Sequence, residues 1–145
     1  MANIVPDSFK EELFEAIHDF TASTGDTFKL ALYNTVSGFA AATTTVYAAT
    51  IGSSVEVTGT GYTATGATLT NISPTVAQNV AFVDFNDVTF TTATITAAAA
   101  LIYNTTNGSK AVVVLDFGGS KTSTNGDFTI QFPAANSTSA ILRIS

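Results

Sequence analysis

The chain has 145 residues, of which 46% are hydrophobic and only 11% are charged, and its formal net charge is −6. This length predicts one domain, and five basic residues in all are too few for a nucleic-acid surface. The absence of Cys excludes disulfides and thiolate metal sites, and a single His argues against a histidine-rich zinc site or a Ser-His-Asp triad. No apolar run reaches the roughly 18 residues of a membrane span. This composition disfavours most enzymes, and it indicates no cofactor.

The first twenty residues differ from the rest in charge and in periodicity. Five of the eleven acidic residues lie between positions 7 and 19. Residues 8–11 (SFKE) match a capping box, and Pro6 suits a helix entry. We therefore expect residues 1–20 to form an arm and an acidic amphipathic helix, spanning about residues 6–20, ahead of a single β domain over residues 21–145. The apolar stripe of this helix recurs at steps of three and four, at Phe9, Leu13, Ala16, Ile17 and Phe20.

From residue 27 onward the pattern is that of β-strands. Residues 28–33 alternate with a period of two, residues 80–85 are almost wholly apolar, and residues 128–132 alternate again. Weaker strands are expected near residues 55–57, 69–72 and 141–144. Residues 88–95 form another, and residues 97–103 either continue it after a bend or begin a new one. Residues 111–115 (AVVVL) have no polar face and should be covered on both sides.

Turn chemistry separates these strands. Asn107-Gly108 is a strong hairpin signal, since both residues tolerate a positive φ. Gly118-Gly119 and Asn125-Gly126 are expected to flank a polar loop, and Pro74 should lie outside any central ladder. Residues 34–65, rich in Thr, Ala, Gly and Ser, are expected to form long loops with weak strands. The fold class is thus mainly β, an antiparallel β-sandwich or small barrel of about eight or nine short strands with one N-terminal amphipathic α-helix.

The helix supports two interpretations. Its stripe packs against its own β core, as amphipathic helices in small domains usually do, or it docks on a groove or basic surface of a partner. For the docking interpretation the candidate partner-binding residues share either the apolar stripe or the acidic face. They are Phe9, Leu13, Ile17, Glu11, Glu12 and Glu15.

No other residues indicate a catalytic or metal centre. His18 and Asp19 point about 100° apart on a helix, so a solvated His near the helix end is expected. The aspartates of the C-terminal half should hydrogen-bond local backbone in turns, and Asp84 and Asp87 are the sole calcium candidates. Tyr47 and Tyr62 are either contact residues or loop anchors. Uncharged, Thr-rich strands such as residues 89–96 favour a homo-oligomer or lattice component, because edges are normally guarded by charge.

Several segments resemble small virion proteins of tailed bacteriophages. They are residues 4–13 (IVPDSFKEEL), 20–29 (FTASTGDTFK), 55–62 (VEVTGTGY), 100–104 (ALIYN), 114–118 (VLDFG) and 128–133 (FTIQFP). Among these proteins, size and neutral β composition are similar to those of capsid decoration, or cement, proteins.

The resemblance implies a non-enzymatic protein on the capsid exterior of a virion. It would bind the major capsid protein and itself, as a dimer or trimer, and contact neither nucleic acid nor membrane. Such a clamp gains strength from multivalent attachment. The alternative is a tail- or fibre-associated protein touching the host surface, through the loops of residues 34–65. A small cell-wall glycosidase is a distant third, because it needs a convergent acid pair.

Overall fold

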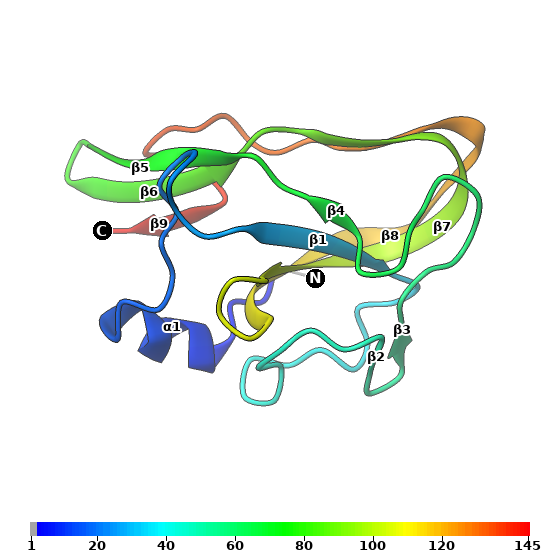
Figure 1. Ribbon diagram of the computed structural model, residues 1–145, viewed down its shortest axis with the longest axis horizontal. Coiled ribbons are helices and arrows are strands. Elements are labelled where there is room, and N and C mark those ends of the chain that lie inside the picture. Colours follow the sequence, from blue (N-terminus) through cyan, green and yellow to red (C-terminus); the bar gives the residue numbers. More distant parts are fainter. Residues whose placement is uncertain (1–2) are drawn as a thin grey trace.

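A computed structural model describes residues 3–145, and nearly half of the chain, 49%, lies in strands. The described chain forms three antiparallel sheets and one short N-terminal helix, without a closed barrel, so the predicted β-sandwich-like class is confirmed (Figure 1). In chain order the elements are α1 (Asp7–Phe14), β1 (Phe28–Tyr33), β2 (Thr50–Ile51), β3 (Ser54–Val55), β4 (Ala67–Thr68), β5 (Asn71–Ala77), β6 (Val80–Phe85), β7 (Val88–Asn104), β8 (Lys110–Ile130) and β9 (Leu142–Ile144).

The largest sheet has the strand order β4-β1-β7-β8. The part of it formed by β1, the end of β7 and the start of β8 is buried on both faces. Alternation along β1 sends Phe28, Leu30 and Leu32 into the larger hydrophobic cluster, and Ala31 and Tyr33 into a smaller one behind it. Residues 34–56 supply the cover for that second face, through side chains such as Phe39, Tyr47 and Ile51. Their only strands are the two-residue β2 and β3, as the loop-rich composition predicts.

The long hairpin of β7 and β8 dominates the fold. Residues 97–103 continue the strand that begins at Val88, which decides the question that the sequence left open. Asn107-Gly108 lies in the turn between the two strands, with Gly108 at φ +66°, so the hairpin prediction is confirmed. The prediction of a polar loop around residues 118–126 is wrong. These residues belong to β8, and their glycines accompany register shifts rather than chain reversals.

A second, three-stranded sheet has the order β5-β6-β9. Its central strand β6 matches the predicted residues 80–85. Pro74 lies in the edge strand β5, where the register with β6 shifts between Ile72 and Thr75. A residue without a backbone N–H is tolerated at such a place, because no ladder hydrogen bond is lost there.

The predicted helix is too long, and its capping box does not form. α1 ends at Phe14, and Ala16 takes a left-handed φ of +57°. The chain turns there so that the following residues can pack beneath Phe9. Ser8 Oγ is buried without a hydrogen-bond partner, because the helix begins two residues earlier than a Ser8 cap would require, with Pro6 at the N-cap position. The Asp7 N–H is instead satisfied by the Ala41 carbonyl oxygen at 2.9 Å.

Candidate functional site

The candidate site is the outer face of α1, and its anchoring begins with the segment that precedes it. Ile4 pairs with Val114 of β8 through two reciprocal backbone hydrogen bonds of 2.9 and 2.8 Å. Phe9, 3% exposed, packs its ring against His18 and Phe20 at centroid distances of 5.0 and 6.2 Å. The short helix is therefore held on the β core by its apolar face.

Glu12 fixes the same helix from its inner side. It is 6% exposed, and its two carboxylate oxygens accept from His18 Nε2 and Lys110 Nζ, both at 2.8 Å. The hydrogen bond to Glu12 raises the pKa of Lys110. Lys110 opens β8, so this buried carboxylate joins α1 to the β7–β8 turn.

His18 extends the connection to Asn104 at the end of β7. The Asn104 side-chain oxygen accepts the backbone N–H groups of Thr106 and Asn107 at 3.0 and 3.2 Å, which fixes the orientation of its amide. Its Nδ2 group lies 3.0 Å from His18 Nδ1 and donates to Asp26 Oδ2 at 2.7 Å. Because an amide nitrogen can only donate, His18 accepts at Nδ1 and donates from Nε2 to Glu12. The predicted solvated His is thus wrong, since its side chain is fully buried.

The six candidate residues predicted for this helix divide between the interior and the surface, and two of them fall outside it, since Glu15 is its C-cap and Ile17 lies beyond its end. Phe9 and Glu12 lie inside the fold, and Leu13 and Ile17 are partly buried, with Leu13 packed against the core. Glu11 and Glu15 are exposed. A partner can therefore reach the two exposed carboxylates without any rearrangement, whereas contact with Phe9 or Glu12 requires α1 to leave the core.

Phe14 is the residue that the sequence reasoning passed over. It is 95% exposed, the highest value among the large hydrophobic side chains of the described chain. Glu11 lies one turn before it on the same helix, and Glu15 follows it directly. The signal was present in the periodicity, because Phe14 falls outside the apolar stripe and hence on the solvent side of the helix. A partner that covered this ring would remove a large apolar surface from water, which makes Phe14 the candidate contact of the helix.

A second buried carboxylate, Glu56, binds together the loops formed by residues 34–65. Its oxygens accept from the hydroxyls of Tyr47 and Tyr62, both at 2.6 Å, and from the Thr65 backbone N–H at 2.7 Å. The Tyr103 hydroxyl donates to the Thr65 carbonyl oxygen at 2.6 Å, and Tyr33 donates to a loop carbonyl. All four tyrosines of the chain thus gather here. Tyr47 and Tyr62 are loop anchors rather than contact residues.

These tyrosines titrate unlike free ones. Burial, with the nearby Glu56 charge, raises the pKa of all four, and that of Tyr103 reaches about 12. Desolvation disfavours the phenolate, and a neighbouring carboxylate repels it. Tyr47 and Tyr62 therefore act as neutral donors to one carboxylate, and Tyr33 and Tyr103 donate to backbone carbonyl oxygens beside it.

The four aspartates of the C-terminal half bind backbone rather than one another. Asp84 and Asp116 accept local N–H groups, from Phe85 and Gly118, as predicted, although both lie within strands rather than in turns. Asp87 and Asp127 accept N–H groups across the chain. Burial raises the pKa of Asp84. Within residues 3–145 no three His, Cys, Asp or Glu side chains gather where a metal ion would be held.

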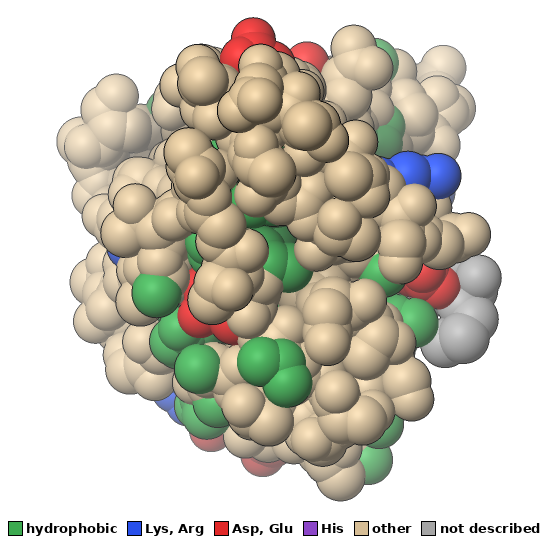
Figure 2. Space-filling model, turned by 90° about the vertical axis from the view of Figure 1, so that its right-hand side faces the viewer, with side chains coloured by type: hydrophobic (Ala, Val, Ile, Leu, Met, Phe, Trp, Pro, Cys, Tyr) green, Lys and Arg blue, Asp and Glu red, His purple; other side chains and the backbone are tan. Residues whose placement is uncertain are grey.

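The surface elsewhere is rich in hydroxyls. Thr pairs face each other across β7 and β8, with Oγ1 atoms 2.9 Å apart at Thr89 and Thr129 and 2.8 Å apart at Thr96 and Thr122. Figure 2 shows one end of the molecule, where backbone and uncharged polar side chains together cover most of the surface. The residues described include no helix long and apolar enough to cross a membrane. No protein-family model matches the chain, and neither a curated protein nor a solved structure matches it.

Proposed function

We propose that the protein is a non-enzymatic structural protein of a virion, which binds the outer surface of a phage capsid and cements neighbouring capsid subunits. The observation that carries the proposal is Phe14, an aromatic side chain 95% exposed on a helix that is anchored on its opposite face. Because α1 is anchored on the β core, the position of Phe14 is largely fixed before binding. Little conformational entropy is therefore lost when a partner covers the ring.

The charge beside Phe14 defines the partner surface. Glu11 and Glu15 are exposed and form no ion pair within residues 3–145, whereas Asp7 is bound by Lys10 at 2.7 Å. An apolar pocket with a basic rim on the major capsid protein would match this arrangement. The hydroxyl-rich strands support self-association of the protein as a dimer or trimer, since neighbours rather than charges would guard their edges. Several weak contacts per assembly then add up to firm attachment.

Binding to capsids that lack the protein tests the proposal directly. Cosedimentation with Phe14→Ala should show at least a tenfold weaker association than the unchanged chain, as expected for a buried aromatic anchor. Val76→Ala is the matched control, because Val76 is 70% exposed but lies on β5. Equal binding of Phe14→Ala and the unchanged chain would reject α1 as the docking element.

The alternative is a tail- or fibre-associated protein in contact with the host surface, favoured by the loops of residues 34–65. Copy number per virion, measured by quantitative mass spectrometry, separates the two roles. Hundreds of copies in simple ratio to the major capsid protein support decoration, and a handful supports the tail. Absence from virions would reject both.

A further inference from the structure

The chain contains two Asn-Gly pairs, and the fold places them in different surroundings. Asn107-Gly108 lies in the turn between β7 and β8, whereas Asn125-Gly126 lies far along β8. An asparagine before a glycine can react with its own backbone, because the glycine has no Cβ to shield its nitrogen from the asparagine side-chain carbonyl carbon. The reaction also requires that the side-chain amide turn toward this nitrogen. The freedom of each amide to turn therefore decides which pair reacts.

The Asn107 amide is held in place by the fold. Its side-chain nitrogen donates to the Ile17 carbonyl oxygen at 2.8 Å and to Asp26 Oδ2 at 2.9 Å, at a partly buried position. Both hydrogen bonds must break before the amide can turn toward the nitrogen of the following glycine. The same Asp26 oxygen also accepts from Asn104 Nδ2 at 2.7 Å, so movement of Asn107 would disturb a second amide. The fold thus protects this pair.

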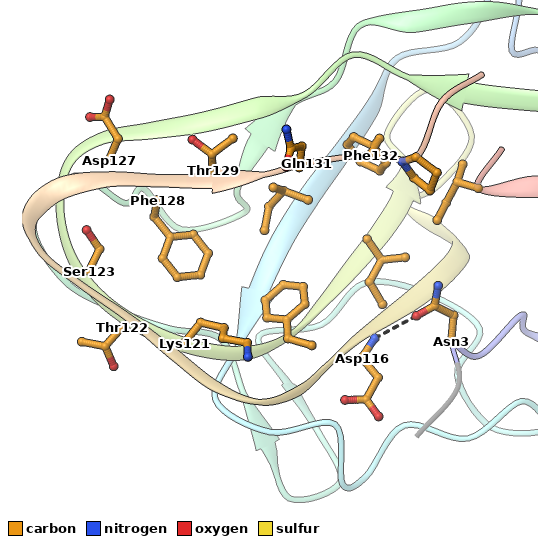
Figure 3. A pocket seen from close by; sticks show the side chains of 15 residues that line it. Asn3, Asp116, Lys121, Thr122, Ser123, Asp127, Phe128, Thr129, Gln131 and Phe132 are labelled. Carbon is orange, nitrogen blue, oxygen red and sulfur yellow. Dashed lines mark hydrogen bonds between the residues drawn. The ribbon is translucent and has the colours of Figure 1, made fainter. Parts of the chain in front are cut away.

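Asn125 lies in a bulge of β8. Two residues of this strand, Thr124 and Asn125, oppose the single residue Thr94 of β7, and the next pair, Ala93 with Gly126, has register shifts on both sides. Asn125 is exposed and takes a left-handed φ of +49°. Figure 3 shows the sharp bend that β8 makes here, at the left of the view. Local opening of such a bulge breaks few ladder hydrogen bonds, so this pair is free to react.

The hydroxyl of Thr94 orients the Asn125 amide. Thr94 Oγ1 accepts the Asn125 backbone N–H at 3.0 Å and donates, more weakly, to the Asn125 side-chain oxygen at 3.4 Å. Within residues 3–145 the Asn125 side-chain nitrogen donates to no protein group, so ammonia can leave from it into solvent. A donor on the carbonyl oxygen also stabilises the negative charge that develops there when a nucleophile attacks the carbon.

We propose that Asn125 is a site of spontaneous deamidation, assisted by the Thr94 hydroxyl, and that Asn107 is protected from this reaction. The Gly126 nitrogen loses its proton to hydroxide and attacks the Asn125 side-chain carbonyl carbon. Ammonia leaves with a proton from water, and a cyclic succinimide forms. Water then opens either carbonyl of the ring, which yields aspartate or isoaspartate and adds a negative charge to a hydroxyl-rich ribbon. The proposal does not depend on the docking role of α1.

Peptide mapping by mass spectrometry of the full chain tests the proposal. The protein is incubated in mildly alkaline buffer made with heavy-oxygen water, which labels each newly formed carboxylate. In the folded protein Asn125 should convert at least about tenfold faster than Asn107, because two hydrogen bonds restrain the Asn107 amide. In urea the two pairs should convert at similar rates, since neither is then restrained. Equal rates in the folded protein, or conversion of Asn125 in urea alone, would overturn the proposal.

Three variants test the groups that take part. An alanine Cβ at Gly126 would lie 3.6 Å from Ser123 Oγ, an ordinary contact, so Gly126→Ala should fold, and its methyl group should slow conversion of Asn125 at least about tenfold. Thr94→Val should slow conversion about threefold in the folded protein, as expected for the loss of one weak hydrogen bond, and should leave the rate in urea unchanged. Thr91→Val, at another exposed position of β7, is the matched control and should change neither rate. An unchanged or faster rate in folded Thr94→Val would overturn the role of that hydroxyl.

Discussion

Glu12 and Glu56 lie almost equally deep, at 6% and 7% exposure, yet the fold holds them in different ways. Glu12 meets a histidine and a lysine ammonium, whereas Glu56 meets two tyrosine hydroxyls and one backbone N–H. A buried carboxylate is costly unless hydrogen bonds or an opposite charge compensate for lost water. The protein thus satisfies one carboxylate partly by charge and the other by neutral donors alone.

This difference predicts how strongly each cluster responds when its carboxylate is removed or its donors are deprotonated. Lys110 is 36% exposed in its side chain, so it can regain water if Glu12 is lost. Glu56 accepts from three donors rather than two, and its two tyrosines belong to the packing between loop and sheet, so more groups lose their acceptor when this carboxylate is removed. We therefore expect the Glu56 cluster to respond more strongly to mutation and to alkali, and the Glu12 cluster to respond more weakly.

The largest expected effect is loss of the fold in strong alkali through the tyrosine cluster. The folded pKa values lie above the unfolded value near 10, so the stabilisation they give is complete below about pH 10 and declines as pH rises toward 12. Tyrosinate absorbance should stay low until circular dichroism reports unfolding, and then rise for all four tyrosines together. Ionisation of any tyrosine near pH 10 in the folded protein would contradict the raised pKa values that burial and Glu56 are expected to give the cluster.

Glu56→Ala should cost about 3–5 kcal/mol of unfolding free energy, because it leaves three donors without an acceptor. Urea unfolding followed by circular dichroism measures the loss. Glu15→Ala, at an exposed position on the C-cap of α1, should change stability by no more than about 0.5 kcal/mol. A loss below about 1 kcal/mol for Glu56→Ala would mean that water replaces the carboxylate.

Glu12→Ala should cost less, about 2–3 kcal/mol, since one of its two partners can turn to solvent. The matched control is the neighbouring Glu11→Ala, because Glu11 is exposed. The same urea experiment compares them with Glu56→Ala. If Glu12→Ala proves the more damaging of the two buried variants, the supposed advantage of a solvent-accessible partner is wrong.

Local features of the fold could be predicted from the sequence, whereas neither the Glu12 cluster nor the Glu56 cluster could. Strands such as residues 28–33 and 80–85, and the turn at Asn107-Gly108, depend on periodicity and on φ preferences of neighbouring residues. The end of α1 depends on contacts of Phe9 with residues beyond the helix, so its predicted length is wrong. The bulges of β8 similarly replace the expected polar loop, because pairing with β7 continues through them.

The two carboxylate clusters could not be predicted, because the residues that form each of them are remote from one another in the sequence. His18 meets Asn104, 86 positions away, and nothing beside His18 in the chain indicates that contact. Glu56 is bonded by residues from both flanking loops, which periodicity does not bring together. For the candidate site, the sequence located the helix and its exposed acids, and the missed Phe14 was readable from the same stripe that placed Phe9.

The smallest expected effect is that of Lys110→Met. Its Nζ bonds Glu12 at 2.8 Å, but partial exposure limits the value of this ion pair to about 1 kcal/mol or less. The variant leaves Glu12 with His18 as its partner, so the fold should persist and capsid binding through Phe14 should be unchanged. Raising the salt concentration should lower the stability of the unchanged chain slightly and that of Lys110→Met less, because the screened pair is absent. A loss as large as that of Glu12→Ala would show that the lysine, rather than the histidine, carries the connection between α1 and the β7–β8 turn.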